Sequence, residues 1–599
     1  MKNESPNNKK PKNFKVTLKK LLTNLKEYKV SIVLIATFAG ISSLFSIIGP
    51  KILGKATTEI AVGVINKYTT NIGINFDKIF KILITLLILY IISAIFTYLQ
   101  SYLVANIANK YSYTLRKKIL SKINKLPLKY FESQTTGEIL SKLVNDVDVI
   151  TNNLSQSLTQ IISSIVTLIG VLIMMITISP LMTLASLIIL PIGFVLIAKT
   201  VGKSQKHFIT AQEYIGHINS QVEEIYTGHS IVKTYNATDL VRQEFEKTND
   251  ILYNSSWKSQ FLSGMMQPIM NFIGNLGYVL VAILGGYLTI QGKIEVGYIL
   301  SFTQYIRSFN QPIAAIASIA NIMQSTIAAA ERVFDFLETK EESPDTPKYK
   351  TNEIIGNVEF NNVSFGYDKN KNIINNFNIK VKSGEKVAIV GPTGAGKTTI
   401  VKLLMRFYDV KQGAILIDGM NIKDLKKEEL RNIFGMVLQD TWLFGGTIKD
   451  NIRYGCIDAK DEEVINACKS VYIDHFIKTL PDSYNHVVDE ETTNISSGQK
   501  QLLTIARVIL KNPKILILDE ATSNVDTRTE ILIQKAMDKL MRNRTSFVIA
   551  HRLSTIKNAD KIIVMDKGDI VEIGNHKELL KKKGFYYGLY HAGFNTGEE

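Results

Sequence analysis

The sequence predicts an all-α membrane domain of six long helices, followed by a soluble α/β domain. Long stretches without Asp, Glu, Lys or Arg fill the first half of the 599 residues, although 21% of the whole chain is charged. In the second half, a short apolar strand leads through a Gly-rich loop into a helix. The composition excludes a disordered, collagen-like or disulfide-stapled chain. Cys456 and Cys468 are too few for a disulfide framework or a Cys-rich metal site.

The charge-free stretches have the length of membrane crossings. A helix needs about 20 apolar residues to cross the hydrocarbon of a bilayer, and Ser179-Pro180 supplies a turn that divides the longest stretch into two crossings. Buried helices of a soluble protein rarely extend so far without charge. We therefore expect transmembrane helices at roughly residues 30–52, 82–106, 158–178, 181–201, 267–290 and 296–323.

Positive charge gives the orientation. Lysine and arginine gather in the first 29 residues and in the long segments after the second and fourth predicted spans. By the positive-inside rule these segments and both termini are cytoplasmic, in a multi-pass protein of the cell membrane. Residues 14–29 mix apolar side chains with lysines and predict an amphipathic helix on the inner leaflet. This topology and the anionic lipid bilayer explain the net charge of +16, so no nucleic-acid partner is expected.

These patterns divide the chain into four parts. Residues 1–29 are predicted to form a cytoplasmic tail and an elbow helix, and residues 30–330 the transmembrane domain with two long intracellular loops. A polar, Pro-containing stretch at residues 341–353 marks the domain boundary. We therefore expect a linker over residues 331–353 and the α/β domain over residues 354–599.

A phosphate-binding loop lies in the second domain. The strand Lys386–Val390 is followed by Gly-Pro-Thr-Gly-Ala-Gly-Lys-Thr and then by a helix. This is a P-loop in the context that it requires, where backbone N–H groups surround phosphates at a helix N-terminus. Lys397 is expected to neutralise the β- and γ-phosphates, and the Thr398 hydroxyl to bind Mg²⁺. The residues predicted to hold the nucleotide are Gly391, Pro392, Thr393, Gly394, Ala395, Gly396, Lys397, Thr398 and Thr399.

A second apolar strand, Ile515–Leu518, ends in two acidic residues, Asp519 and Glu520. An Asp at the tip of such a strand is placed to hold Mg²⁺, directly or through water. The adjacent Glu520 can polarise the attacking water as a general base. Downstream of a P-loop, the pair predicts hydrolysis of a nucleoside triphosphate.

One further motif distinguishes among the many P-loop enzymes. Residues 495–501 (ISSGQKQ) resemble the signature motif of ABC ATPases, usually written LSGGQ. The resemblance implies that Ser496, Gly498 and Gln499 contact ATP. It also implies an adenine-stacking aromatic residue, a Q-loop residue at the Mg²⁺ ion and a switch histidine, which match Tyr367, Gln439 and His551. Residues 523–526 (SNVD) match the D-loop of the family.

The membrane half resembles that of ABC exporters. Residues 126–148 look like the first intracellular loop of that family, and residues 223–235 look like the second. The resemblance implies a half-transporter, six spans fused to one ABC ATPase domain, that drives efflux with ATP and Mg²⁺. Its cargo is left open among hydrophobic or amphipathic small molecules, lipids and peptides. The fusion argues against an importer permease and the spans against a soluble ABC ATPase, whereas an ATP-gated channel or regulatory subunit stays open.

The signature motif also implies a partner, because in the family it contacts ATP held by a second domain. One chain with one P-loop must then dimerise, and short helices near residues 130 and 215 would transmit closure to the spans. Ser497 stands where the family has Gly, and residues 489–492 lack two glycines that the family usually shows, while Asp519, Glu520 and His551 are intact. This combination favours a heterodimer with a second half-transporter over a homodimer, which stays open.

One charge, Arg307, lies far from either end of its predicted span. Arg307 lies about eleven residues into the sixth span, where a charge should not face lipid. Two polar stripes recur at helical spacing and predict the walls of a water-filled cavity, although hydrogen bonds to neighbouring helices are the alternative. They comprise Gln304, Arg307, Asn310 and Gln311 in the sixth span and Gln267, Asn271 and Asn275 in the fifth.

Overall fold

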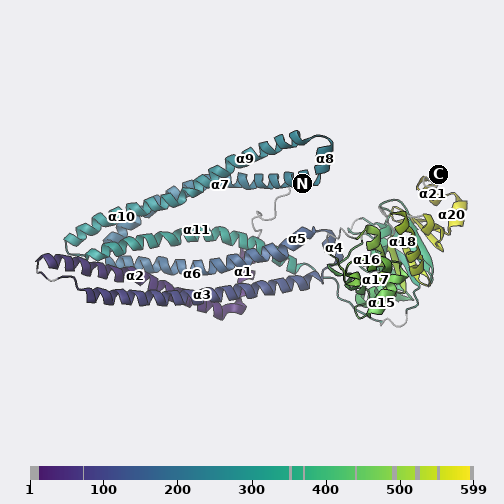
Figure 1. The fold of residues 1–599 in the computed structure, drawn as a ribbon, viewed down its shortest axis with the longest axis horizontal. Coiled ribbons are helices and arrows are strands. Elements are labelled where there is room, and N and C mark those ends of the chain that lie inside the picture. The colour runs from purple at the N-terminus through teal and green to yellow at the C-terminus, as the bar shows by residue number, and fades with distance from the viewer. Residues whose placement is uncertain are drawn as a thin grey trace. The chain divides into compact units, whose positions relative to one another are not determined.

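The computed structural model has two compact units, a helical one and an α/β one (Figure 1). They divide after Glu341, except that Pro127–Lys129 group with the second unit. The prediction of a helical membrane domain followed by an α/β domain is confirmed. The structure describes residues 13–69, 71, 73–349, 354–368, 371–438, 441–488, 495–519, 526–549 and 553–593, without some side chains at 158, 189–194, 310–321, 553–554 and 592–593.

Long helices dominate the first unit, and each predicted span lies within one of them. Charged residues continue the same helices beyond the apolar stretches, so that the 48 residues of the third helix extend about 72 Å. The long helices are α2 (Lys29–Thr69), α3 (Phe76–Ile123), α6 (Val147–Ile178), α7 (Pro180–Thr227), α9 (Thr238–Gly264), α10 (Met266–Ile290) and α11 (Val296–Glu338). Shorter ones are α1 (Phe14–Leu25), α4 (Leu128–Glu132), α5 (Thr136–Ser141) and α8 (His229–Thr234).

Four stretches of the described chain are long and apolar enough to cross a membrane. They contain the first, second, third and fifth predicted spans, so the chain has multiple spans. The fourth and sixth predicted spans lie in α7 and α11, where several side chains fall outside the described set, and they stay predictions. The short helix expected near residue 215 is misplaced. α7 continues through Gly216 to Thr227 and ends before Gly228, and the short helix that follows is α8.

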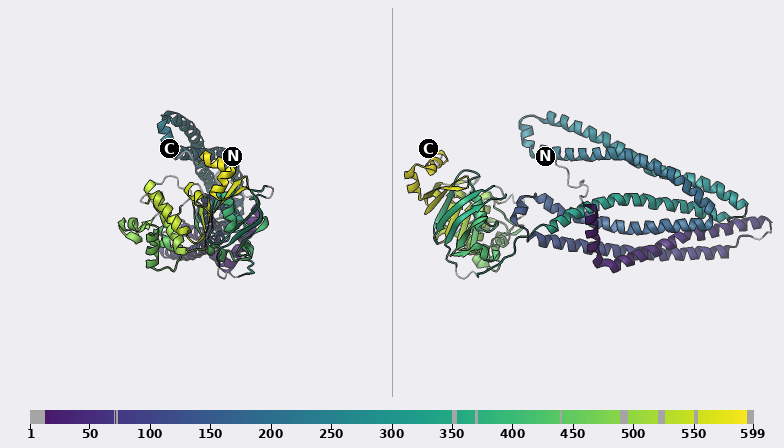
Figure 2. Two further views of the ribbon diagram at one scale, coloured as in Figure 1. Left: turned by 90° about the vertical axis from the view of Figure 1, so that its right-hand side faces the viewer. Right: turned by 180° about the vertical axis from the view of Figure 1, so that it is seen from behind.

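The helices pack in two groups. α2 packs against α3, and α11 lies along both α2 and α6. α7 and α9 lie side by side and diverge from α11 toward the end that carries α8 (Figures 1 and 2). α10 continues this pair and packs against α11.

The contact between α2 and α11 combines hydrogen bonds with two closely packed glycines. The Ser301 hydroxyl of α11 donates to the carbonyl of Pro50 at 2.7 Å, and the Tyr305 hydroxyl donates to that of Ile47 at 2.8 Å. One turn further on, a Cβ atom on Gly297 would overlap the carbonyl oxygen of Gly54. Only glycine lets the two backbones come this close.

The predicted elbow helix is α1. One stripe of α1, which includes Leu21 and Leu25, is buried against Tyr111 and Leu115 of α3 and the end of α11. Lys20 pairs with Glu338 of α11. The other stripe exposes apolar side chains, at Phe14, Val16 and Leu22. α1 therefore has an apolar face left for a lipid surface.

Two sheets build the second unit. The first has the order β2-β1-β4-β5, and the second β12-β11-β3-β10-β9-β6, with only β12 antiparallel. Their bounds are β1 Val358–Phe365, β2 Ile374–Val381, β3 Lys386–Val390, β4 Gln412–Ile417, β5 Met420–Asn421, β6 Phe434–Val437, β9 Ile515–Asp519, β10 Thr545–Ile549, β11 Lys561–Asp566 and β12 Asp569–Gly574. A two-residue pair joins β7 (Gly446–Thr447) to β8 (Val487–Val488).

Helices cover both faces of the six-stranded sheet. Because strand residues alternate between faces, Val387 and Ile389 of β3 join the core shared with the four-stranded sheet and α12 (Lys397–Leu404). Ala388 and Val390 join the opposite core, with α17 (Ser497–Lys511) and α18 (Thr527–Met541). The remaining helices are α13 (Lys427–Ile433), α14 (Ile448–Arg453), α15 (Asp461–Ser470), α16 (Asp474–Thr479), α19 (Leu553–Lys557), α20 (His576–Lys582) and α21 (Phe585–Gly593).

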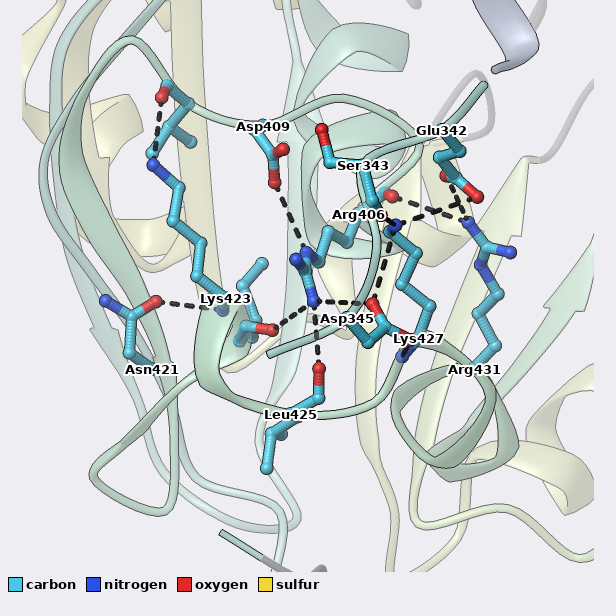
Figure 3. A network of polar contacts seen from close by, with 12 residues as sticks. Glu342, Ser343, Asp345, Arg406, Asp409, Asn421, Lys423, Leu425, Lys427 and Arg431 are labelled. Atoms are coloured by element: carbon cyan, nitrogen blue, oxygen red, sulfur yellow. Dashed lines mark hydrogen bonds and ion pairs between the residues drawn. The ribbon is translucent and has the colours of Figure 1, made fainter. Parts of the chain in front are cut away.

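The predicted linker differs from a free connector. Residues 331–338 belong to α11, and Glu342–Asp345 bind the second unit through ion pairs (Figure 3). Lys427 donates its backbone N–H to Asp345 at 3.0 Å, and Arg431 pairs with Glu342 at 3.2 Å. Arg406, 5% exposed, lies 3.6 Å from Asp345 and donates to two loop carbonyls. Part of the predicted linker is thus a fixed segment of the second unit. Residues 350–353 lie outside the described chain.

Candidate functional site

One edge of the six-stranded sheet gathers the predicted site. Strands β3, β10, β9 and β6 are parallel neighbours, so their carboxyl ends meet at the same edge. The P-loop follows β3 and Asp519 ends β9. Gln439, Glu520 and His551 come shortly after β6, β9 and β10 in the sequence, but these three residues lie outside the described ones. Their roles stay predictions, and the strands before them all lead to this edge.

The P-loop folds tightly between β3 and α12. Gly391 has a φ of +155° and Gly396 a φ of +99°, values that residues with a Cβ rarely adopt. A Cβ on Gly391 would also overlap the carbonyl oxygen of Met565, and one on Gly396 would lie 2.6 Å from Ile374. Within the loop, Pro392, Thr393 and Gly394 are exposed and Ala395 is buried. Glycines at 391 and 396 are therefore required to bring the loop back onto the start of α12.

Lys397 is the first residue of α12 and reaches back over the loop. Its ammonium donates to the carbonyl oxygens of Gly391, at 2.6 Å, and Pro392, at 3.0 Å. Burial lowers the pKa of Lys397, and the nearby Asp519 carboxylate opposes that shift. The structure thus brings together the residue expected to neutralise phosphate and the residue expected to hold Mg²⁺.

Tyr367 lies against the helix that follows the loop. Its hydroxyl is 3.3 Å from that of Thr399, which is buried, whereas Thr398 is exposed beside it. Its ring packs edge-on against Tyr408, with ring centroids 5.0 Å apart. Lys402 places its ammonium 5.7 Å from the centre of the Tyr367 ring. The half-buried aromatic residue predicted to stack on adenine is therefore next to the P-loop helix.

Sequence reasoning missed Lys402 and Tyr408 as part of this site. Lys402 follows Thr398 by four residues and Thr399 by three, and helical spacing places all three on neighbouring positions of one face. That spacing was a readable signal for Lys402. Nothing local indicates Tyr408, because its contact with Tyr367 joins residues far apart in the chain.

The signature residues begin α17. The Ser496 hydroxyl accepts the backbone N–H of Gln499 at 3.3 Å, and the Gln499 side chain accepts the backbone N–H of Ser496 at 2.9 Å. This is a capping box, which the Ser-x-x-Gln spacing could have indicated. Gly498 is buried in the first turn. The side chains of Ser496 and Gln499 therefore bond to backbone groups at the start of their own helix in this structure.

The signature helix and the P-loop helix pack on opposite faces of the same sheet. α12 contributes Ile400 and Leu403 to one core, and α17 contributes Leu502 and Ile505 to the other. The sheet and its side chains lie between them. The structure therefore does not place Ser496 and Gly498 beside the P-loop of their own chain.

The described residues suit a Mg²⁺ ion that takes most of its oxygen ligands from phosphate and water rather than from protein. They include no group of three or more His, Cys, Asp or Glu side chains that could hold a metal ion. A hydroxyl at Thr398 and a carboxylate at Asp519 offer the hard oxygen ligands that Mg²⁺ prefers, in the small number it usually takes from protein. Residue chemistry at the sheet edge therefore fits the predicted ion.

Comparison with known proteins agrees with this architecture. Residues 32–313 match the family model of the ABC transporter transmembrane region, and residues 374–523 match the ABC transporter model. A fatty acid ABC transporter ATP-binding/permease protein of Mycobacterium tuberculosis is 45% identical over 87% of this chain and 82% of its own length. A putative multidrug export ATP-binding/permease protein of Bacillus subtilis is 37% identical, over 82% of this chain and 85% of its own length.

A third relative has a different named cargo. The ATP-dependent lipid A-core flippase of Syntrophus aciditrophicus is 35% identical over 86% of each chain. The similarity covers most of the length of each of these three relatives, so it includes both the membrane domain and the ATPase domain. The chain therefore belongs to the ABC transporter family, as an exporter half-transporter whose membrane region is fused to an ATPase domain that couples ATP to transport.

Proposed function

We propose that this chain is one subunit of an ATP-driven efflux pump, in which ATP bound between two subunits switches a transmembrane cavity from inward-facing to outward-facing. Hydrolysis then resets the cavity. The cargo is a hydrophobic or amphipathic small molecule, lipid or peptide. The names of the relatives support this breadth, because they include a fatty acid, lipid A-core and multidrug export.

The observation that carries the proposal is the separation of α12 and α17 by the six-stranded sheet. A helix start that carries Ser496 and Gly498 offers N–H donors and a positive dipole end to an anion. Because that start cannot reach the P-loop of its own chain across the sheet, its ATP must be held by another subunit. ATP binding then favours the closed pair, and a closed pair shifts the membrane domain between its two states.

Each predicted residue has a role in this cycle. Backbone groups of Gly391–Gly396 bind phosphates, Lys397 neutralises them, and Tyr367 stacks on adenine. Thr398, Asp519 and Gln439 would hold Mg²⁺, which supplies charge neutralisation at the phosphates. Thr399 supports the start of α12 and bonds to Tyr367. Two residues take part in the hydrolysis step: Glu520 orients and deprotonates the attacking water, and His551 contacts the γ-phosphate.

The proposed orientation places both termini in the cytoplasm. The apolar stripe of α1 then rests on the inner leaflet, with its lysines among anionic headgroups. In this orientation the intracellular ends of α3, α6, α7, α9 and α11 project from the membrane into the cytoplasm. These ends carry the short helices α4 and α8, which would transmit closure to the spans.

Vectorial transport by the purified assembly in proteoliposomes tests the proposal. A fluorescent amphiphile should accumulate on the side opposite the ATPase domain, against its gradient, only with ATP and Mg²⁺. Lys397→Ala should abolish accumulation, because the phosphates lose their cation. Lys426→Ala, which removes an exposed lysine outside the P-loop, is the matched control. Movement only down a gradient would instead identify an ATP-gated channel and refute the pump.

We further propose that the partner is a different half-transporter. The altered signature at Ser497 would face the weaker ATP site, while this chain's Asp519, Glu520 and His551 would serve the active one. Expression of this chain alone is the test. A stable homodimer with strong, cargo-stimulated ATPase activity would refute the heterodimer.

A further inference from the structure

The described part of the membrane domain shows no counter-ion for Arg307 of α11. Arg307 lies eleven residues after the start of α11, a distance of about 16 Å along the helix and close to half of a hydrocarbon core of about 30 Å. Its side chain is exposed, and no hydrogen bond or ion pair to it is found among the described residues. The charge-free stretches of the other predicted spans contain no Asp or Glu. The predicted spans therefore supply no carboxylate to pair with Arg307.

A cavity of about 450 Å³ lies in front of Arg307, lined by Leu300, Thr303, Gln304, Arg307 and Ser308. Their spacings of three and four residues place them on one face of α11. The Thr303 hydroxyl is used within its own helix, donating to Ile299 at 2.9 Å. Among the described lining residues, the polar groups left for a ligand are the guanidinium of Arg307, the amide of Gln304 and the hydroxyl of Ser308.

The opposite face of α11 is packed. Phe302, Tyr305, Ile306 and Phe309 are buried in a core shared with α2, α6 and α10. Arg307 is thus fixed by the packing of its helix toward the cavity side. The second predicted wall stays a prediction. Gln267 and Asn271 of α10 are exposed, bond to each other at 3.2 Å, and are not among the described residues that line this cavity.

We propose that this cavity binds the anionic headgroup of an amphiphile, a carboxylate or a phosphate monoester, with Arg307 as its counter-ion. The proposal deepens the proposed function by naming the class of cargo. The planar donor fork of a guanidinium matches the oxygens of either group, and Gln304 and Ser308 add neutral donors. The volume falls in the range of sites for drug-sized ligands. The apolar chain of the amphiphile would extend past Leu300.

A second copy of this chain cannot replace the ligand as counter-ion. Its predicted spans are equally free of Asp and Glu. In a dimer of two copies, two guanidinium groups would face one cavity and strengthen its preference for anions. A different partner with a carboxylate in its spans could neutralise Arg307, and the experiment below would then show no anion preference.

Direct binding to the purified assembly in phosphatidylcholine nanodiscs tests the proposal. Laurate, dodecyl phosphate and dodecanol have the same chain length and differ in the headgroup. We expect laurate, dodecyl phosphate or both to bind at least about tenfold more tightly than dodecanol, a difference of about 1.4 kcal/mol. The separate values for laurate and dodecyl phosphate distinguish a carboxylate cargo from a phosphate one. Equal affinity of all three probes would overturn the proposal.

Four variants test whether the headgroup preference depends on Arg307. Arg307→Gln should reduce the ratio of anion to alcohol affinity to within about twofold, whereas Arg307→Lys should retain most of it. Lys293→Gln, which removes an exposed cation in the loop before α11, should leave the ratio unchanged. An unchanged ratio in Arg307→Gln would overturn the proposal. Because that variant could fail to fold, Gln304→Glu gives a second test: a carboxylate one turn from Arg307 should also abolish the anion preference.

The failures of the two proposals are distinguishable. Binding in nanodiscs needs no ATP, so the headgroup preference is read independently of transport. Anion-selective binding without ATP-driven accumulation would refute the pump but not the site. ATP-driven accumulation that is equal for laurate and dodecanol, together with equal affinities, would refute only the site.

Discussion

Arg332 of α11 and Asp146 form a bidentate ion pair between residues that are 186 positions apart. The Arg332 Nε–H donates to one Asp146 oxygen at 3.0 Å, and Nη2 donates to the other at 2.5 Å. Asp146 is only 2% exposed and precedes α6, in the segment that resembles the first intracellular loop. The pair therefore connects that loop to the last helix of the membrane domain.

Loss of this pair should destabilise the membrane domain strongly. Arg332→Met leaves a buried carboxylate without its partner, which typically costs about 3–5 kcal/mol. The neighbouring pair Arg116–Asp148 is the matched control, because both side chains are about half exposed and such pairs contribute about 1 kcal/mol or less. We expect a much larger fall in the unfolding temperature of the purified assembly for Arg332→Met than for Arg116→Met. Equal shifts would show that Asp146 is solvated in the folded protein.

The crossing of α2 and α11 should not tolerate a methyl group. In Gly297→Ala the new Cβ overlaps the backbone carbonyl of Gly54, which cannot rotate away as a side chain can. Overpacking typically costs about 1–3 kcal/mol or more. Gly40→Ala, elsewhere on α2, meets no atom within 4 Å and is the control. The unfolding temperature and the yield of folded protein should fall for Gly297→Ala and not for Gly40→Ala. A wild-type unfolding temperature in Gly297→Ala would show that the two helices separate easily at this point.

Glu520→Gln should keep ATP binding and nearly stop turnover. The amide fills the same space but cannot accept a proton, so we expect a loss of about 10²-fold or more in ATPase rate. Glu428→Gln makes the same chemical change at an exposed site on α13 and should have no effect. The purified complex is required, since a partner's competent site would leave residual activity. ATPase activity of Glu520→Gln within a few-fold of wild type would show that Glu520 is not the general base.

The two cysteines should react very differently with thiol reagents. Cys456 is exposed, whereas Cys468 is fully buried, and burial raises the pKa of its thiol to about 12. Because the thiolate is the reactive form, Cys468 should stay unmodified between pH 7 and pH 9. We expect a maleimide to label one thiol per folded chain and two after denaturation, and Cys456→Ser to remove the folded-state label. Rapid labelling of folded Cys456→Ser would show that the core around Cys468 opens.

The sequence by itself determined the features that local pattern encodes. Stretches without charge have the length of a membrane crossing, and the order Lys386–Val390, P-loop and helix needs no distant residue to be read. The distribution of lysine predicts an orientation from the same kind of local pattern, and that orientation stays a prediction. The resemblance to ABC exporters added the signature motif at residues 495–501 and the family's order of site residues, and the matching models confirmed that family.

Only the tertiary structure decided which distant groups meet. The approach of Gly297 to Gly54, the ion pair between Arg332 and Asp146, and the contact of Tyr408 with Tyr367 each join segments whose separation carries no periodic signal. The docking of residues 342–345 likewise depends on cations of the folded α/β domain. A helix or a P-loop is specified by hydrogen bonds between near neighbours in sequence. Packing between helices and the pairing of charges depend on the whole chain being folded, because each surface exists only after its own element has formed.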